Sequence, residues 1–288
     1  MEKQDDILEE VSAKLSREMR IPQDKIKSLL EKMAAGESSE ENTQKIVDFP
    51  TKNHMDKKSV EEMIQAVRRE MEIVKRYGLY TEKGTLQTYE KVKNNMVVRL
   101  HNLIRDRELL ENAVYRVCGD IAITVYWRAD SGNTLYCMRI LERMLKSWRK
   151  SKETVIQDAL YNTLRVSPPK RYDQTGWVLG QTYVEDIEET AGWKNGLLGN
   201  CISTEEVTFG AVAIFLPGVA QKIADIYQGD FYFAFPFQHG VMVHNVQGTD
   251  PDMVWSSIIH LTLDRREDFV SCHVFRYFRE TEKMEIIR

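Results

Sequence analysis

The sequence lacks the segments that direct a chain to a membrane. Its 288 residues contain no run of about 18 uncharged apolar side chains, the length that spans a bilayer. The first ten residues, MEKQDDILEE, contain neither the basic stretch nor the apolar stretch of a secretory signal. We therefore expect a cytoplasmic protein.

Cysteine is scarce, and its spacing argues against several kinds of site. The chain has four cysteines, far apart in the sequence: Cys118, Cys137, Cys201 and Cys272. No pair has the CxxC spacing of a zinc ribbon or a redox dithiol, and we expect no disulfide framework. Free cysteine usually packs as a small buried hydrophobe, so we expect all four to do so.

The motifs of common metal sites and nucleotide enzymes are also missing. The six histidines show neither the i, i+4 spacing of a helical metal site nor the i, i+2 spacing of a strand site: His54, His101, His239, His244, His260 and His273. The chain has no GxxxxGK[ST] phosphate loop and no Gly-x-Ser-x-Gly nucleophile elbow. We expect no bound metal and no cofactor.

One weak arrangement for covalent catalysis is left. Cys201 is the best available nucleophile, and His239 is a distant base for it. The irregular, glycine-rich segment 170–200 precedes Cys201 and has the character either of a lid over a cleft or of a long surface connection. A hydrolase-type enzyme with its site near this segment and His239 is therefore one alternative.

Charge is distributed unevenly along the chain. The net charge is −4, yet residues 91–170 carry 15 basic and 8 acidic side chains, whereas residues 171–288 carry 9 and 17. The basic residues are densest in the segment 139–152, where a tryptophan interrupts them: Arg139, Arg143, Lys146, Trp148, Arg149 and Lys150. A surface of this kind is suited to binding phosphates and stacking a base, so a nucleic-acid-binding accessory protein is a second alternative. An ordinary solvated helix has the same composition.

The periodicity predicts an α+β fold with a helical N-terminal arm. Apolar residues at helical spacing predict a helical arm over residues 1–35, and residues 36–58 have the polar composition of a flexible linker. An α+β domain follows over residues 59–288, and a helix over 59–77 leads into it. We expect a mixed or antiparallel sheet with packed helices.

Within this domain the pattern places the elements in order. We expect a helix from about Val92 to Ile104, a hairpin of strands 117–127 and 135–140, and helices over 141–148 and from Ser151 to the proline pair at 168–169. The most ordered module is 209–246, with a strand at 209–216, a helix at 219–229 and strands at 231–235 and 241–244. A helix that begins near Pro251 and a strand at 269–278 complete the domain.

Several of these segments resemble a known family. The segments are VVRLHNLIRDRELLEN, DIAITVYW, FGAVAIFLPGVAQKIAD and SCHVFRYFRE, and they span about residues 92–278. Their order resembles an uncharacterised bacterial family with a domain of unknown function, common in anaerobic gut Gram-positive bacteria. The resemblance implies a fold and a bacterial cytosolic setting. The chain departs from the family at Phe237 and Gly240, and residues 1 to about 80 look unlike its usual start.

Together these patterns predict a non-enzymatic binding or regulatory protein that acts through a macromolecular partner. We expect a protein partner and no membrane, and nucleic acid is the alternative partner. The apolar stripes of the N-terminal helices suit self-association as well as docking on their own domain. The candidate binding residues are His239 and the six residues of the segment 139–152 given above.

Overall fold

The computed structural model describes most of the chain from residue 86 onwards. The described residues are 86–130, 135–172, 185–189, 192–263 and 269–288, with residues 12–13, 23–24, 27–28 and 79. The predicted helical arm (1–35), linker (36–58) and helix 59–77 lie almost wholly outside them and stay predictions.

The chain divides into two compact units. One comprises residues 1–92 and 129–136, and its described part includes the short helix α5 (Tyr89–Val92). The other comprises residues 93–128 and 137–288. The sheets and helices described below belong to this second unit. The exceptions are the last two residues of β3 (129–130) and the first two of β4 (135–136), which belong to the first unit.

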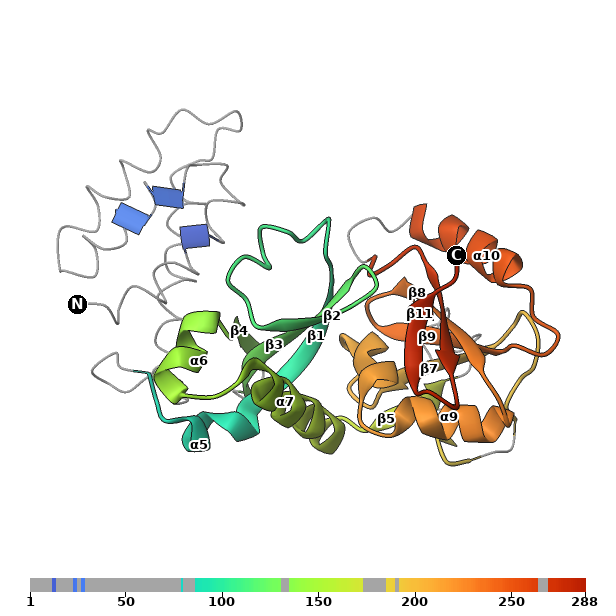
Figure 1. Cartoon of the computed structure of the whole chain (residues 1–288), viewed down its shortest axis with the longest axis horizontal. Helices are drawn as coiled ribbons and strands as arrows, with labels where there is room; N and C mark the ends of the chain where they lie inside the picture. Colours follow the sequence, from blue (N-terminus) through green and yellow to red (C-terminus); the bar gives the residue numbers. More distant parts are fainter. Residues whose placement is uncertain are drawn as a thin grey trace. The chain divides into compact units, whose positions relative to one another are not determined.

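A small antiparallel sheet is built around β3 (Figure 1). Its strands are β1 (Met96–Asn102), β2 (Tyr115–Cys118), β3 (Ile121–Asp130) and β4 (Leu135–Arg139). The strand β3 pairs with each of the other three, and its partners β1 and β2 run antiparallel to it. A two-residue turn, Gly119-Asp120, joins β2 to β3.

The two faces of this sheet differ in polarity because side chains alternate along each strand. Residues that pair across β1 and β3 share a face, and one face is apolar: Met96, Val98, Leu100, Ile123, Val125 and Trp127. The helix α7 (Lys152–Val166) packs along β1, and Thr163 Oγ1 accepts a hydrogen bond from the Val98 amide at 3.0 Å. The opposite face carries Arg99, His101 and Tyr126.

The helix predicted from Val92 to Ile104 is wrong. In this segment the chain forms α5 and a 3-10 turn, η1 (Lys93–Asn95), the strand β1 begins at Met96, and turns follow Asn102. Met96 and Leu100 are four residues apart and so fit a helical stripe, but they also fit the period of two. The first three residues of β1 are all buried, and only Arg99 and His101 further along are partly exposed, so the alternation of the strand is short.

The larger sheet has seven strands in the order β11-β10-β8-β9-β7-β5-β6, and the pairs described in it are all antiparallel. Its strands are β5 (Pro169–Tyr172), β6 (Glu185–Asp186), β7 (Asn200–Thr204), β8 (Phe231–Phe237), β9 (Gly240–Asn245), β10 (Val274–Phe278) and β11 (Lys283–Ile286). Three further helices of the chain are α6 (Glu142–Trp148), α9 (Val219–Tyr227) and α10 (Pro251–Leu263).

Aromatic side chains form the centre of this sheet. Phe231, Phe233, Phe235 and Phe275 are completely buried, and the rings of Phe233 and Phe275 stack at 5.1 Å. On the other face of β8, Tyr232 and Ala234 pack with α10. Both faces of β8 are therefore covered, as the aromatic run predicted for a central strand.

The strand predicted at 209–216 is also wrong. These residues form a buried 3-10 turn, η2 (Gly210–Phe215). Phe209 adopts a left-handed backbone conformation, and a Cβ on Gly210 would overlap Ser203 Oγ, so the chain turns tightly against β7 here. Because every residue of η2 is buried, the sequence has no polar position that could reveal its period.

Other predicted elements are confirmed. The helices α6, α7, α9 and α10 and the strands β8 and β9 occur where the sequence predicted them, and β8 continues through Pro236 by a register shift. The predicted strand 117–127 is two strands, β2 and β3, divided at Gly119. The fold class is α+β, as expected. No helix in the described part of the chain is both long and apolar enough to cross a bilayer.

Gly119 is required at the β2–β3 turn, which yields a stability prediction. Its φ is +60°, and a Cβ there would lie 2.7 Å from Ile286 Cδ1 and from Phe275 Cε1. We expect Gly119→Ala to lower the free energy of unfolding in urea by about 2–4 kcal/mol. In Gly229→Ala the new methyl group meets no atom within 4 Å, so the change should be below about 1 kcal/mol. Equal losses in the two variants would contradict the steric argument.

Candidate functional site

Cys201 lies in β7, where it is only 2% exposed and packs with Tyr172 and Met242. Burial raises the pKa of its thiol to about 12. The thiol is therefore protonated at neutral pH, whereas a cysteine nucleophile acts as a thiolate.

His239 lies in the turn between β8 and β9. Its Nδ1 accepts a hydrogen bond from the Phe209 amide at 3.0 Å, and its carbonyl accepts one from Ser203 Oγ at 2.6 Å. The first contact fixes the tight turn that precedes η2, and the second joins β7 to the turn between β8 and β9. The contacts described for His239 and for Cys201 do not join the two residues.

The six candidate binding residues between 139 and 150 do not share one surface. Arg139 and Trp148 are buried, Arg143 and Lys150 are half-buried, and Lys146 and Arg149 are exposed. Trp148 is thus a packing residue of α6, and only part of the basic charge faces solvent.

The position of Cys201 predicts the order of thiol reactivity. In native protein at pH 8, N-ethylmaleimide should leave Cys201 unlabelled while it modifies the half-buried Cys272, because thiolate fraction and access both control the reaction. Peptide mass spectrometry measures the order, and protein unfolded in urea should label at all four cysteines. Fast labelling of native Cys201 would contradict this prediction.

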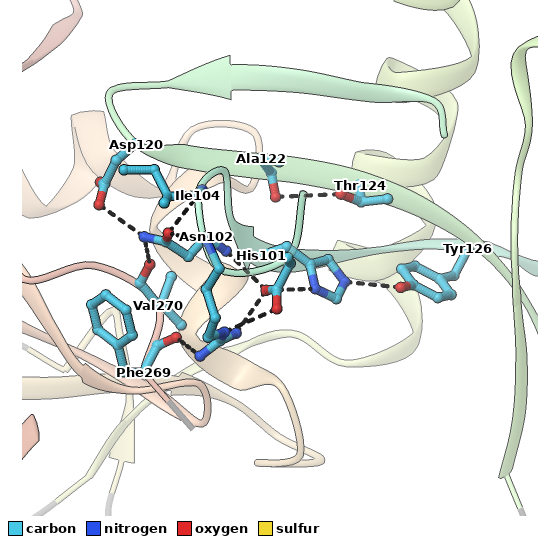
Figure 2. A network of polar contacts seen from close by, with 11 residues as sticks. His101, Asn102, Ile104, Asp120, Ala122, Thr124, Tyr126, Phe269 and Val270 are labelled. Atoms are coloured by element: carbon cyan, nitrogen blue, oxygen red, sulfur yellow. Dashed lines mark hydrogen bonds and ion pairs between the residues drawn. The ribbon is translucent and has the colours of Figure 1, made fainter. Parts of the chain in front are cut away.

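A polar network covers the other face of the small sheet (Figure 2). His101 lies between two partners: Asp106 Oδ2 is 3.3 Å from its Nδ1, and the Tyr126 hydroxyl is 2.8 Å from its Nε2. Arg99 from the same strand stacks its guanidinium on Phe209 at 3.9 Å from the ring centroid. The network therefore ties β1 and β3 to the turn before η2.

Asp106 is the negative centre of this network. Its Oδ2 also accepts the Asn102 amide at 3.1 Å, and Arg105 donates to both of its oxygens. Burial by itself would raise the pKa of Asp106, but hydrogen bonds and the charges of His101 and Arg105 outweigh burial and hold this pKa well below its usual range. The carboxylate is thus ionised throughout the physiological pH range.

The second part of the network fixes the β2–β3 turn. The Asn102 side-chain amide donates to Asp120 Oδ2 and to the Val270 carbonyl, both at 2.9 Å (Figure 2). Ser271 Oγ donates to the other oxygen of Asp120 at 2.6 Å. Since residues 269–271 lead directly into β10, Asp120 joins the end of β2 to the start of the β10–β11 hairpin.

A groove of about 430 Å³ lies between these two joined elements. One side is β2, which contributes Arg116, Val117 and Cys118, and the other is the β10–β11 hairpin with Glu282 and Met284. Apolar residues of α7 and η2, among them Leu160 and Ile214, complete the lining. We call this cavity the β2 groove.

The edge of β2 faces the groove. Consecutive strand side chains point to opposite faces, so residues 116, 117 and 118 can all border one cavity when the edge of the strand faces it. Of the described strands only β3 pairs with β2. Cys118 and Ile121 flank the two-residue turn, and in such a turn the flanking pair is a hydrogen-bonded pair. Hydrogen-bonded and non-hydrogen-bonded pairs alternate along antiparallel strands. Tyr115 and Val117 therefore direct their amides away from β3.

The groove is flanked by a second sheet edge. β11 ends the order of the seven-stranded sheet, and its partner among the described strands is β10. Val117 is 53% exposed and Ile286 39% exposed, so apolar side chains on both edges face solvent. No group of three or more histidine, cysteine, aspartate or glutamate residues in the described ranges could hold a metal ion.

The comparisons with known proteins place the chain in a family. The sequence profile of DUF5688, a family of unknown function, matches residues 48–277. The chain is a member of the DUF5688 family. This match begins well before residue 92, so part of the segment expected to be unlike the family falls within it. Comparisons of this DUF5688 chain with curated proteins and with solved structures found no match.

Sequence reasoning missed both the network and the groove. The sequence places His101 and Asp106 five residues apart, a spacing that typifies neither a metal site nor a helix face. Tyr126 joins them only because β1 pairs with β3. The one local signal was Gly119-Asp120, a typical dipeptide for a two-residue hairpin turn.

Asp106 gives the DUF5688 chain a defined pH dependence. Its folded pKa lies below the unfolded value near 3.9, so its contribution to stability is complete above that value and is lost as pH falls toward the folded pKa. We expect Asp106→Asn to lower the free energy of unfolding by about 1–3 kcal/mol at pH 7. The difference in free energy of unfolding between Asp106→Asn and the native protein should become smaller below about pH 4.

Urea unfolding from pH 7 to pH 2.5 measures this gap, with Glu280→Gln at an exposed position as the control. The control should track the native protein at every pH. A gap for Asp106→Asn that stays constant down to pH 2.5 would show that its carboxylate charge does not stabilise the fold.

Proposed function

We propose that this DUF5688 protein is a non-enzymatic binding protein that receives an extended polypeptide segment along the edge of β2. The observation that carries the proposal is a strand edge that pairs with no described strand other than β3 and that faces a groove lined by both apolar and polar side chains. In this proposal the protein acts in the bacterial cytoplasm, and the polypeptide belongs to a partner that it regulates.

The backbone geometry supports strand addition. Val117 presents its main-chain donor and acceptor at the β2 groove, and Tyr115 directs its own away from β3 just beyond the groove. A partner strand pairs with such groups whatever its sequence. The turn at Gly119 and the Asp120 contacts hold this edge in place before a partner arrives. A preformed edge lowers the ordering cost of binding.

The lining supports recognition of apolar side chains. Val117 and Met284 border the groove from its two sides, and the buried residues Leu160 and Ile214 lie beneath it. Each apolar side chain of a partner that is fully buried there contributes about 1.5–3 kcal/mol. Main-chain pairing thus provides affinity, and the lining selects partners with apolar residues on one face.

The described residues around the groove favour binding over catalysis. The groove has one thiol in its described lining, Cys118, and burial raises the pKa of that thiol to about 11. A thiol with this pKa is almost entirely protonated at pH 7 and is a poor nucleophile. Asp106, His101 and Tyr126 belong to the polar network on the small sheet, and none of the three lines the β2 groove.

Val117 offers a test that separates main-chain pairing from side-chain packing. Peptides are selected from a phage-displayed library of random dodecapeptides on the full chain and measured by fluorescence polarisation. Val117→Pro removes an outward amide that β3 does not use, whereas Val117→Thr keeps the amide and the branched side chain. We expect Val117→Pro to weaken binding about tenfold or more and Val117→Thr to weaken it less than threefold.

Val117→Lys tests the same edge without any change to the backbone, and we expect it to weaken binding because it replaces an apolar contact of the partner by a charged side chain. Near-ultraviolet circular dichroism checks that each variant keeps the native fold. Selected peptides that bind all three variants as tightly as the native protein would refute the proposal. A library that yields no peptide above the resin background would refute it as well.

A further inference from the structure

A second cavity lies at the other end of β2. Its volume is also about 430 Å³, and Tyr115, the first residue of β2, is part of its lining. Three carboxylates border it, Glu108, Glu111 and Glu142, against one guanidinium, that of Arg107. We call this the acidic cavity.

The three carboxylates are available to a ligand. All three residues are exposed, and in the described part of the chain none of them forms an ion pair. Like charges that share a cavity repel one another, and a positive group placed between them relieves that repulsion. The charge of the acidic cavity is therefore complementary to a basic side chain.

The strand β2 connects the acidic cavity to the β2 groove. Tyr115 borders the first, and its neighbours Arg116, Val117 and Cys118 border the second. A strand advances about 3.3 Å per residue, so a partner of six or seven residues that pairs with β2 is long enough to reach both. The β2 groove and the acidic cavity then contact successive parts of one extended segment.

We assign the partner an antiparallel direction. The pairs described in both sheets are antiparallel, and antiparallel pairing is also the more common arrangement in proteins. A partner antiparallel to β2 has its C-terminal part beside Tyr115. Its apolar residues then lie in the β2 groove, and the residues that follow them lie in the acidic cavity.

Resting on the proposed function, we propose that the partner is a polypeptide segment in which extended apolar residues are followed, on their C-terminal side, by lysine or arginine. The apolar part pairs with Val117, and the basic part meets Glu108, Glu111 and Glu142. Because these carboxylates are exposed, salt screens their attraction, and they contribute more to selection among partners than to total affinity.

The experiment uses the same random dodecapeptide library, selected at 50 mM and at 500 mM salt on the full chain. We expect peptides from the low-salt selection to carry lysine or arginine two to four residues after an apolar stretch. The best peptide is then compared with versions in which its basic residues are changed to glutamine or moved to its N-terminal end. Both changes should weaken binding three- to tenfold at low salt and much less at high salt.

A protein variant with Glu108→Gln, Glu111→Gln and Glu142→Gln should lose this preference and bind the original and glutamine peptides alike. A matched variant with three exposed glutamates changed elsewhere, Glu189→Gln, Glu205→Gln and Glu280→Gln, should keep it. Peptides that depend on Val117 but show no basic preference would overturn this inference and leave the proposed function standing. Peptides that bind without dependence on Val117 would overturn both.

Discussion

The bridge made by Asp120 is the contact on which the arrangement of the two sheets depends. One carboxylate oxygen accepts from Asn102 at the end of β1, and the other accepts from Ser271 just before β10. The turn that carries Asp120 must lie against Phe275 and Ile286, which leaves room only for a glycine at position 119. With β2 held at this point, a groove lies along the edge that pairs with no described strand other than β3.

The module 209–246, which has the clearest pattern in the sequence, packs against both the small sheet and the β2 groove. Its helix and strands build the aromatic core around Phe233, and its turn η2 presents Ile214 to the β2 groove. Phe209 stacks with Arg99, and His239 fixes the backbone of Phe209. His239 thus has a structural contact in a place where the sequence suggested a catalytic one.

The sequence predicted those elements whose local signal agrees with their surroundings. The helix α7 has an apolar stripe and a serine cap, and β8 has an aromatic run, so both were found. η2 was missed because it is buried on every side, which removes the polar positions that reveal a period, and β1 was missed because Met96 and Leu100 also fit a helical stripe. The candidate site could not be predicted, because a free strand edge exists only once its neighbours have paired. Glu108, Glu111 and Glu142 were also hidden within a segment whose overall charge is basic.

The length of β2 limits what its open edge can do. With four residues, only Tyr115 and Val117 turn their backbone groups outward, and the Gly119 turn ends the strand immediately afterwards. A second copy that paired with this edge would gain few hydrogen bonds, and the charge of Arg116 beside the edge disfavours stacking of further copies. The short strand can therefore serve as a recognition surface without seeding fibrils, so the protein should withstand high concentration better than a longer exposed edge would allow.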